Sequence, residues 1–369
     1  MGSVIRLENV VKKFGKKEVI HGIDLNTREG ELSFLLGPSG AGKTTILNLI
    51  AGVVPMTSGN IYIGDKNVNN LKPKDRNVAI AFESYALYPN RTVYGNMRFP
   101  LDAPVRNHEL TDKQKDERVR QYARLLQIDD LLDRFPKELS GGQRQRVALG
   151  RTLVRTPSVY LLDEPIAHLD AKLRHQMRAE LKQLQVKLNI PFICTSPDQS
   201  EAVAMADRIF LLNSGKVEQE GSSHDLYFSP INEFVALMLG EPKMTINLFN
   251  YSRDGGKSYF TKEDLKLEAP EGFEKYAHDK SMPAAVDLGI RPTDMKMSLA
   301  KAEGYEAFDL DFYQINGEKF IMTCMKGKTK IVVEAKRELG VTLKLGQKIY
   351  LKWDTGNFYL FDPATKLSL

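Results

Sequence analysis

The chain has 369 residues, and its 52 Lys and Arg against 47 Asp and Glu give a formal net charge of +5. This length predicts about two to three domains, and the small, mixed charge argues against nucleic acid as a partner. Only Cys194 and Cys324 are present, which argues against a disulfide framework or a cysteine-based zinc site. No apolar stretch is long enough to span a bilayer, and residues 1–9 lack a signal-peptide core. We expect a cytoplasmic protein that could still dock on a membrane protein.

Apolar periodicity in the first two thirds of the chain predicts an α/β domain. Helices are predicted at 44–51, within a charged insertion from about 92 to 138, and at 169–188. The runs at 31–36 and 159–163 are continuously apolar, which is typical of buried parallel strands. The complete set of predicted strands is 4–11, 18–26, 31–36, two within 61–81, 159–163, 192–194, 209–212 and 216–217.

After about residue 242 the pattern changes to short alternating segments separated by Gly, Asp and Lys turns. Residues 319–322, 330–333 and 348–351 are examples. Many short strands of this kind predict a separate small β-barrel. We therefore expect an N-terminal domain at 1–242, with a helical subdomain at about 84–158, and a C-terminal domain at 243–369.

The strongest motif follows the predicted strand at 31–36 and opens the predicted helix at 44–51. It fits the P-loop pattern in the required context. Glycines let backbone N–H groups wrap a phosphate, Lys43 would reach the β- and γ-phosphates, and the Thr44 hydroxyl would hold Mg²⁺. The alternative is a glycine-rich turn without a ligand. The motif residues are Gly37, Pro38, Ser39, Gly40, Ala41, Gly42, Lys43 and Thr44.

A second motif is the acidic end of the apolar strand at 159–163. Asp163 is placed to hold Mg²⁺ through water, and Glu164 to polarise an attacking water. The alternative is a pair of ordinary solvated acids, which the P-loop makes a weaker interpretation.

A third motif, residues 139–146, begins LSGGQ and starts a predicted helix. Ser140 followed by two glycines makes a second anion-binding helix N-terminus. One nucleotide needs only one P-loop, so this second motif indicates a site shared between two chains. The alternative is a capped helix after a flexible turn.

The residues 139–143 resemble the signature motif of ATP-binding cassette (ABC) proteins, with the P-loop and Asp163-Glu164 at matching spacing. The resemblance covers nearly the whole chain and points to ATPase subunits of bacterial importers of sugars, polyols and glycerol phosphates, the maltose type. The segments that carry it are 82–101, 226–240, 288–292 and 360–362.

The resemblance implies a P-loop NTPase fold with antiparallel N-terminal strands, a helical subdomain and an OB-like regulatory tail. Two such cassettes would close head to tail on two ATP molecules with Mg²⁺, each ATP lying between one P-loop and the partner's signature motif. The loop 85–89 would receive a permease helix, although core packing is the alternative interpretation of Tyr85, Leu87 and Tyr88. The nucleotide-binding residues so implied are Phe14, which stacks on adenine, residues 37–44, Thr45, Ser140, Gly141, Gly142, Gln143 and Asp170.

Two catalytic positions depart from the family pattern. Glu83 stands where the family has a Gln that senses Mg²⁺ and water, so it adds negative charge beside a triphosphate while still offering an oxygen to the metal. Pro197 stands where the family has a His that contacts the γ-phosphate, and proline has no side-chain donor and no N–H. His168, in a third variant loop, is interpreted as a surface residue.

These departures predict that the chain binds ATP but hydrolyses it weakly at its own P-loop, while its intact signature motif completes a partner's site. We expect a heterodimer with a second, competent ABC ATPase at the cytoplasmic face of the plasma membrane. It would bind two transmembrane permease subunits and, indirectly, an extracytoplasmic solute-binding protein. The alternatives are an active homodimeric sugar-importer ATPase, a soluble non-transport ABC protein, and a regulatory ATP-binding scaffold. The solute is not determined by the sequence.

Overall fold

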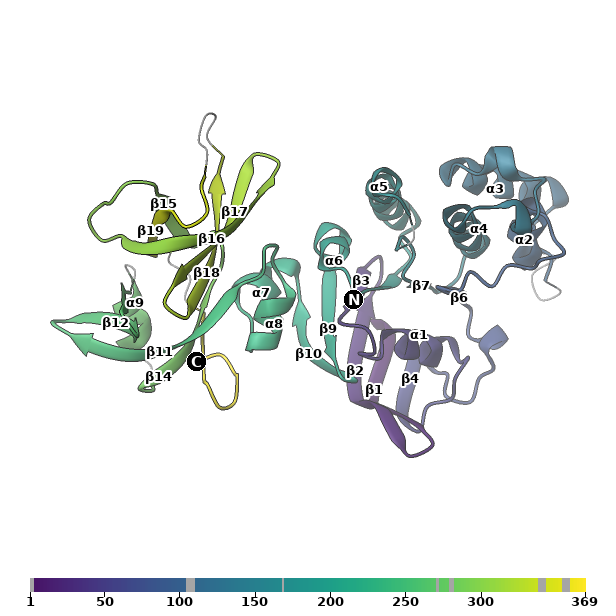
Figure 1. Ribbon diagram of the computed structural model, residues 1–369. Coiled ribbons are helices and arrows are strands. Elements are labelled where there is room, and N and C mark those ends of the chain that lie inside the picture. The colour runs from purple at the N-terminus through teal and green to yellow at the C-terminus, as the bar shows by residue number, and fades with distance from the viewer. Residues whose placement is uncertain are drawn as a thin grey trace. The chain divides into compact units, whose positions relative to one another are not determined.

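The computed structural model describes residues 3–103, 110–167, 169–269, 272–278, 282–337, 343–353 and 359–369. The chain forms two compact units, Met1–Ser223 and His224–Leu369 (Figure 1). Within the described segments, no helix is both long and apolar enough to cross a bilayer.

The N-terminal unit contains two sheets. An antiparallel sheet has the order β2-β1-β4-β5, and a six-stranded sheet has the order β10-β9-β3-β8-β7-β6. In the second sheet only the pairing of β10 with β9 is antiparallel. The strands are β1 (Ser3–Phe14), β2 (Lys17–Arg28), β3 (Leu32–Leu36), β4 (Ser58–Ile63), β5 (Lys66–Asn67), β6 (Val78–Ala81), β7 (Val159–Asp163), β8 (Phe192–Ser196), β9 (Arg208–Asn213) and β10 (Lys216–Gly221).

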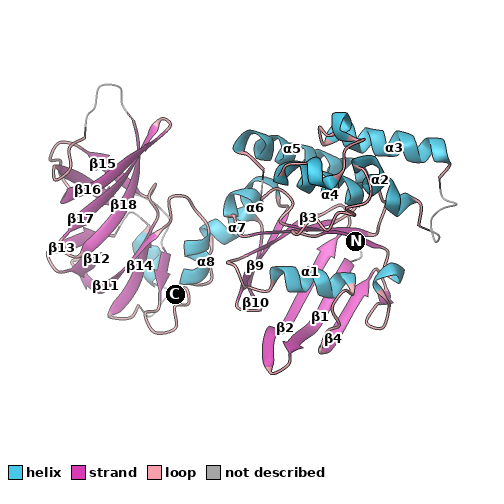
Figure 2. Ribbon diagram, turned by 45° about the vertical axis from the view of Figure 1, so that its right-hand side comes forward, coloured by secondary structure: helices cyan, strands magenta, loops and turns pink. Residues whose placement is uncertain are grey.

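Helix α1 (Lys43–Ala51) lies between the two sheets. Its Ile46, Leu47 and Ile50 are fully buried and share one core with Leu7 of β1 and Phe210 of β9. In Figure 2, α4, α5 and α6 lie on the side of the six-stranded sheet away from α1. The remaining helices of this unit are α2 (Val93–Arg98), α3 (Asp112–Leu125), α4 (Gly141–Leu153), α5 (Ala171–Leu188) and α6 (Gln199–Met205), with 3₁₀ turns at Pro73–Asp75, Phe99–Leu101, Asp129–Leu131 and Pro136–Glu138.

Strands β3, β7 and β8 are buried along their whole length. This burial explains their continuous apolar runs, because helices cover both faces of a parallel sheet. The strands are adjacent and parallel, so their carboxyl ends meet at one edge. The P-loop, the Asp163-Glu164 pair and Pro197 all begin at that edge.

The C-terminal unit is built from two antiparallel five-stranded sheets, which confirms the predicted all-β domain. Their inner faces share one core that includes Phe260, Phe308 and Trp353. The first sheet has the order β13-β12-β11-β14-β20 and the second β15-β19-β16-β17-β18. The elements are α7 (Ser223–Phe228), α8 (Glu233–Met238), β11 (Thr245–Asp254), β12 (Lys257–Lys262), β13 (Leu265–Glu268), α9 (Phe273–His278), β14 (Ala285–Ile290), β15 (Met295–Ser298), β16 (Glu306–Asn316), β17 (Lys319–Lys326), β18 (Thr329–Lys336), β19 (Lys348–Trp353) and β20 (Tyr359–Phe361).

The division at residue 223 lies earlier than the boundary expected at 242, because the segment holding α7 and α8 belongs to the β-rich unit. Arg291 explains this attachment. Its guanidinium is buried, donates to the carbonyl oxygens of Leu239 (2.8 Å) and Tyr227, and lies 3.6 Å from the centroid of the Tyr227 ring. A buried cation needs such partners, so the hydrogen bonds and the packing hold this segment together.

Asp294 gives the C-terminal unit a pH-dependent stability. Its carboxylate accepts a hydrogen bond from the Arg291 backbone N–H (3.0 Å), and burial raises its pKa from 3.8 to about 6. The folded state therefore binds the proton more tightly than the unfolded chain, so stability must fall as pH rises from about 4 to about 6.

We expect Asp294→Asn to remove this decline, because the amide oxygen still accepts the hydrogen bond but carries no charge. Urea unfolding monitored by Trp353 fluorescence at several pH values between 4 and 7 measures the slope. The exposed Asp311→Asn is the matched control and should keep the wild-type slope. Equal slopes in wild type and Asp294→Asn would contradict the assignment.

Candidate nucleotide-binding site

The predicted P-loop connects β3 to α1. At Gly37 a Cβ atom would lie 2.4 Å from the Leu212 carbonyl oxygen, so only glycine fits without moving the backbone. Lys43 is buried, and its Nζ donates to the carbonyl oxygens of Gly37 (2.8 Å) and Pro38 (3.0 Å). The Lys43 ammonium group thus binds two backbone carbonyls of the loop and holds its charge against the loop backbone.

Burial lowers the pKa of Lys43, and the charges of Glu164, Asp163 and Glu83 oppose that shift. Three carboxylates therefore act on one ammonium group at the carboxyl edge of the sheet. Their presence shows that Glu83, which lies beyond β6, shares the electrostatic environment of the P-loop lysine.

Asp163 is the centre of a small hydrogen-bond cluster. Its Oδ1 accepts from the hydroxyls of Thr195 (2.7 Å) and Thr44 (3.1 Å). The Thr44 hydroxyl and the Asp163 carboxylate are thus adjacent hard oxygen donors, which is the ligand chemistry that Mg²⁺ takes together with phosphate oxygens. The chemistry of these residues fits the expected metal, which Thr44 and Asp163 would hold.

Glu164 has a positive φ of 47°, a backbone conformation that costs a non-glycine residue about 1–2 kcal/mol. Two contacts hold it in place: its N–H donates to the Thr195 hydroxyl (3.0 Å), and its carbonyl accepts from Gln145 Nε2 (3.0 Å). The sequence did not indicate a positioning role for Thr195 or Gln145. Thr195 comes from β8, and Gln145, although it lies in the third motif at 139–146, reaches Glu164 only because α4 packs beside the end of β7.

The two departures from the family pattern both lie where strands end at this edge. Pro197 is exposed and directly follows β8, the strand between β3 and β7. Glu83 is exposed and follows Phe82 after β6, the neighbour of β7 on the other side. The structure thus places both near the strand ends that carry the P-loop and Asp163-Glu164, as the sequence predicts.

The signature residues form the beginning of α4. Ser140 caps the helix: its hydroxyl accepts from Gln143 N–H (3.3 Å), while Gln143 Oε1 accepts from Ser140 N–H (2.8 Å). No atom of the residues that the structure describes lies within 4 Å of a Cβ built on Gly141. Ser140 is exposed and Gly141, Gly142 and Gln143 are partly so, which leaves this helix end open to a ligand or another chain.

The other predicted nucleotide-binding residues are dispersed around the unit. Phe14 is 49% exposed at the end of β1, with Lys12 Nζ 4.6 Å from its ring centroid. Asp170 caps α5 by accepting from Leu173 N–H (3.0 Å). Thr45 is half-buried in the first turn of α1. His168 lies outside the described residues.

The loop at 85–89 is held by two side chains that the sequence analysis did not single out. Arg151 donates to the carbonyls of Tyr85 (3.1 Å) and Ala86 (2.7 Å), both of which have positive φ. Asn96, fully buried, bonds both the N–H and the carbonyl of Tyr88. The loop is therefore rigid, with its shape set by α2 and α4.

The Tyr88 ring is 39% exposed, so core packing does not account for it. It packs against Phe99 with ring centroids 4.6 Å apart. Both rings line a cavity of ≈ 330 Å³ together with Val53, Arg151 and other residues. Tyr88 and Phe99 thus flank a groove beside the loop at 85–89.

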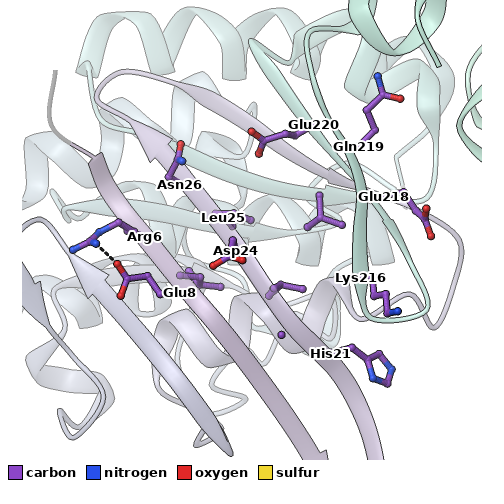
Figure 3. Close-up of a pocket in the computed structure, with 14 residues that line it drawn as sticks. Arg6, Glu8, His21, Asp24, Leu25, Asn26, Lys216, Glu218, Gln219 and Glu220 are labelled. Atoms are coloured by element: carbon purple, nitrogen blue, oxygen red, sulfur yellow. Dashed lines mark hydrogen bonds and ion pairs between the residues drawn. The ribbon is translucent and has the colours of Figure 1, made fainter. Parts of the chain in front are cut away.

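A cavity of ≈ 710 Å³ lies apart from the P-loop, between β2 and β10 (Figure 3). Three of its charged side chains are in ion pairs: Arg6 with Glu8, and Glu220 with Arg208 at 2.5 Å. It contains no P-loop, Asp163 or signature residue. We therefore assign nucleotide binding to the strand ends and not to this cavity.

Comparison with known proteins agrees with this geometry. The family model described as ABC transporter matches residues 20–167. Over 98% of both chains, the sequence is 46% identical to the trehalose/maltose import ATP-binding protein MalK of Thermococcus litoralis. The chain belongs to the ATP-binding subunits of ABC transporters. It is also 38% identical, over 98% of both chains, to the sn-glycerol-3-phosphate import ATP-binding protein UgpC of Escherichia coli.

Solved cassettes show the same fold. The dimeric ATP-binding cassette MJ0796 in a post-hydrolysis state with ADP and phosphate matches with a TM-score of 0.55 and 29% identity, covering 59% of this chain and 98% of that one. The ABC transporter cassette MJ1267 matches with a TM-score of 0.54 and 25% identity, covering 60% of this chain and 92% of that one. The P-loop NTPase fold expected from the sequence is therefore confirmed.

Substitution of Thr195 tests the hydrogen bonds that its hydroxyl makes with Asp163 and Glu164. We expect Thr195→Val to lower the free energy of unfolding of the N-terminal unit by about 2 kcal/mol, because it removes the hydrogen bond to the Glu164 N–H and one of the two hydroxyl hydrogen bonds to Asp163 Oδ1. Chemical denaturation measures the change. Thr195→Ser keeps the hydroxyl and should stay near wild type, so equal losses in both variants would contradict the role of the hydroxyl.

Proposed function

We propose that this chain is the ATP-binding subunit of an importer for a sugar, a polyol such as glycerol, or a glycerol phosphate. The observation that carries the proposal is its likeness, over 98% of both chains, to subunits named for trehalose/maltose and sn-glycerol-3-phosphate import. The chain would sit peripherally on the cytoplasmic face of the membrane, bound to two permease subunits. An extracytoplasmic binding protein would supply the solute.

In this proposal ATP with Mg²⁺ binds at the P-loop of one chain and the signature motif of another. Lys43 faces the phosphates, Thr44 and Asp163 hold the metal, and Glu164 accepts a proton from the attacking water. Phe14 offers an exposed ring for the adenine. Ser140, Gly142 and Gln143, at the exposed start of α4, close the partner's site. The groove beside Tyr88 and Phe99 would receive a helix of the permease.

We further propose that the chain's own site hydrolyses ATP slowly. Pro197 offers no hydrogen-bond donor at the strand end nearest to both the P-loop and Asp163. Glu83 adds a carboxylate to a site where Asp163 and Glu164 already act on Lys43, so it repels the charge that accumulates on the transferred phosphate. Loss of one positioned transition-state contact commonly costs about 10²–10³ in rate.

Restoring the two side chains tests this proposal. We expect Glu83→Gln combined with Pro197→His to raise ATP turnover by the purified chain roughly 100-fold, the scale of one such contact. Steady-state phosphate release measures the change. Adding Glu164→Gln should abolish the gain, and the exposed Glu29→Gln should leave the basal rate unchanged. Brisk wild-type turnover that Glu164→Gln abolishes, without any gain from the double variant, would contradict the proposal.

A chain whose own site is slow but whose signature motif is intact can still support fast hydrolysis at the other site of a dimer. We propose that a second, fully equipped ABC ATPase chain partners this one. This chain's Ser140 and Gly142 would then complete the partner's hydrolysing site, while its own P-loop holds ATP and keeps the pair closed.

Affinity purification of the tagged chain from its source membrane tests the pairing. We expect one copy of this chain, one copy of a second ATPase and two permeases, as measured by native mass spectrometry. A transport-competent complex with two copies of this chain and no second ATPase would establish the homodimer instead.

A further inference from the structure

The C-terminal unit contains a cavity of ≈ 570 Å³ that the ATPase function does not use. It lies between β13, the edge strand of one sheet, and the paired strands β16 and β19 of the other. These strands can be followed in Figures 1 and 2. Its volume is within the range of about 300–1,000 Å³ that small-molecule sites occupy. Residues 259, 266–269, 304–306 and 351–353 line it.

The charges around the cavity do not cancel. Glu268 and Glu306 are neutralised by ion pairs with Lys257 (2.5 Å) and Lys326 (2.6 Å), neither of which lines the cavity. Lys266 and Lys352 do line it, and neither forms an ion pair with a carboxylate of the described residues. Two ammonium groups are thus left for a ligand, which favours an anion of charge near −2.

The two lysines are held at the cavity by local geometry. Lys266 Nζ lies 3.8 Å from the centroid of the Tyr259 ring, a cation–π contact that orients it. The Lys352 side chain runs along Gly304, whose backbone has a φ of 76°; a Cβ there would lie 3.7 Å from Lys352 Nζ. The positive φ favours glycine at this turn, which leads into β16, and the lysine side chain lies beside it.

The rest of the lining suits a hydroxylated carbon skeleton. Tyr259 and Tyr305 are half-buried, and Leu351 and Trp353 are buried. Aromatic and apolar surfaces pack against C–H groups. The carboxylates of Glu268 and Glu306 are acceptors for hydroxyl hydrogens.

From this combination we propose that the cavity binds a small phosphate monoester of a polyol or sugar. Lys266 and Lys352 contact the phosphate, which carries about −1.5 to −2 charges at pH 7. The tyrosine rings and the two glutamates contact the hydroxylated part. The site is separate from the P-loop, and the proposal does not depend on which solute the transporter carries.

Isothermal titration calorimetry on the full chain, saturated with ADP and Mg²⁺ to occupy the P-loop, tests the proposal. The probes are glycerol 3-phosphate, glucose 6-phosphate, inorganic phosphate, glycerol and glucose. We expect the two esters to bind more tightly than inorganic phosphate, and the neutral compounds not to bind. This order distinguishes an ester site from a site for free phosphate.

The double variant Lys266→Gln and Lys352→Gln should weaken ester binding at least tenfold per lysine removed, the usual effect of losing a hydrogen bond to a charged group. Lys330→Gln combined with Lys348→Gln removes two exposed lysines of the same unit that do not line the cavity and should leave binding unchanged. Circular dichroism confirms that each variant is folded. Absence of ester binding at millimolar concentration, equal binding of glycerol, or unchanged binding in the cavity variant would each overturn the proposal.

Discussion

The parallel register of β3, β8 and β7 is the constraint on which the site depends. Leu36 pairs with Ser196, and Thr195 pairs with Asp163, so the three strands end at the same level. Because side chains at strand ends point into a common space outside the sheet, three distant segments meet there. The bond from Thr195 to Asp163 exists only in this register, and it in turn supports the strained backbone of Glu164.

The same arrangement explains how the sheet accommodates Pro197 and Glu83. Proline is poorly tolerated inside a sheet because it cannot donate to the ladder. Pro197 comes one residue after the last residue of β8, so the ladder loses nothing. Glu83 is likewise exposed beyond the end of β6. Both side chains therefore lie outside the ladder hydrogen bonds of the buried strands.

The C-terminal unit is stabilised by interactions of its own. Its core is shared by two antiparallel sheets, and the α7–α8 segment is fixed to it by Arg291. The unit thus has its own core and a buried polar anchor, independent of nucleotide chemistry. Its lysine-lined cavity lies at the junction of the two sheets, where an edge strand leaves space that side chains do not fill. Such a position gives a ligand contacts with both sheets at once.

The sequence by itself determined the P-loop, the acidic strand end, the signature motif and the all-β character of the second unit. These features depend on local patterns: glycine spacing, continuous or alternating apolar runs, and turn residues. Only the tertiary structure decided the roles of Thr195, Gln145 and Arg151, since each acts on a segment distant in the chain. It also moved the unit boundary to residue 223, because the contacts of Arg291 with Tyr227 and Leu239 span more than fifty residues of sequence. Long-range pairing of this kind leaves no periodic trace in a single sequence.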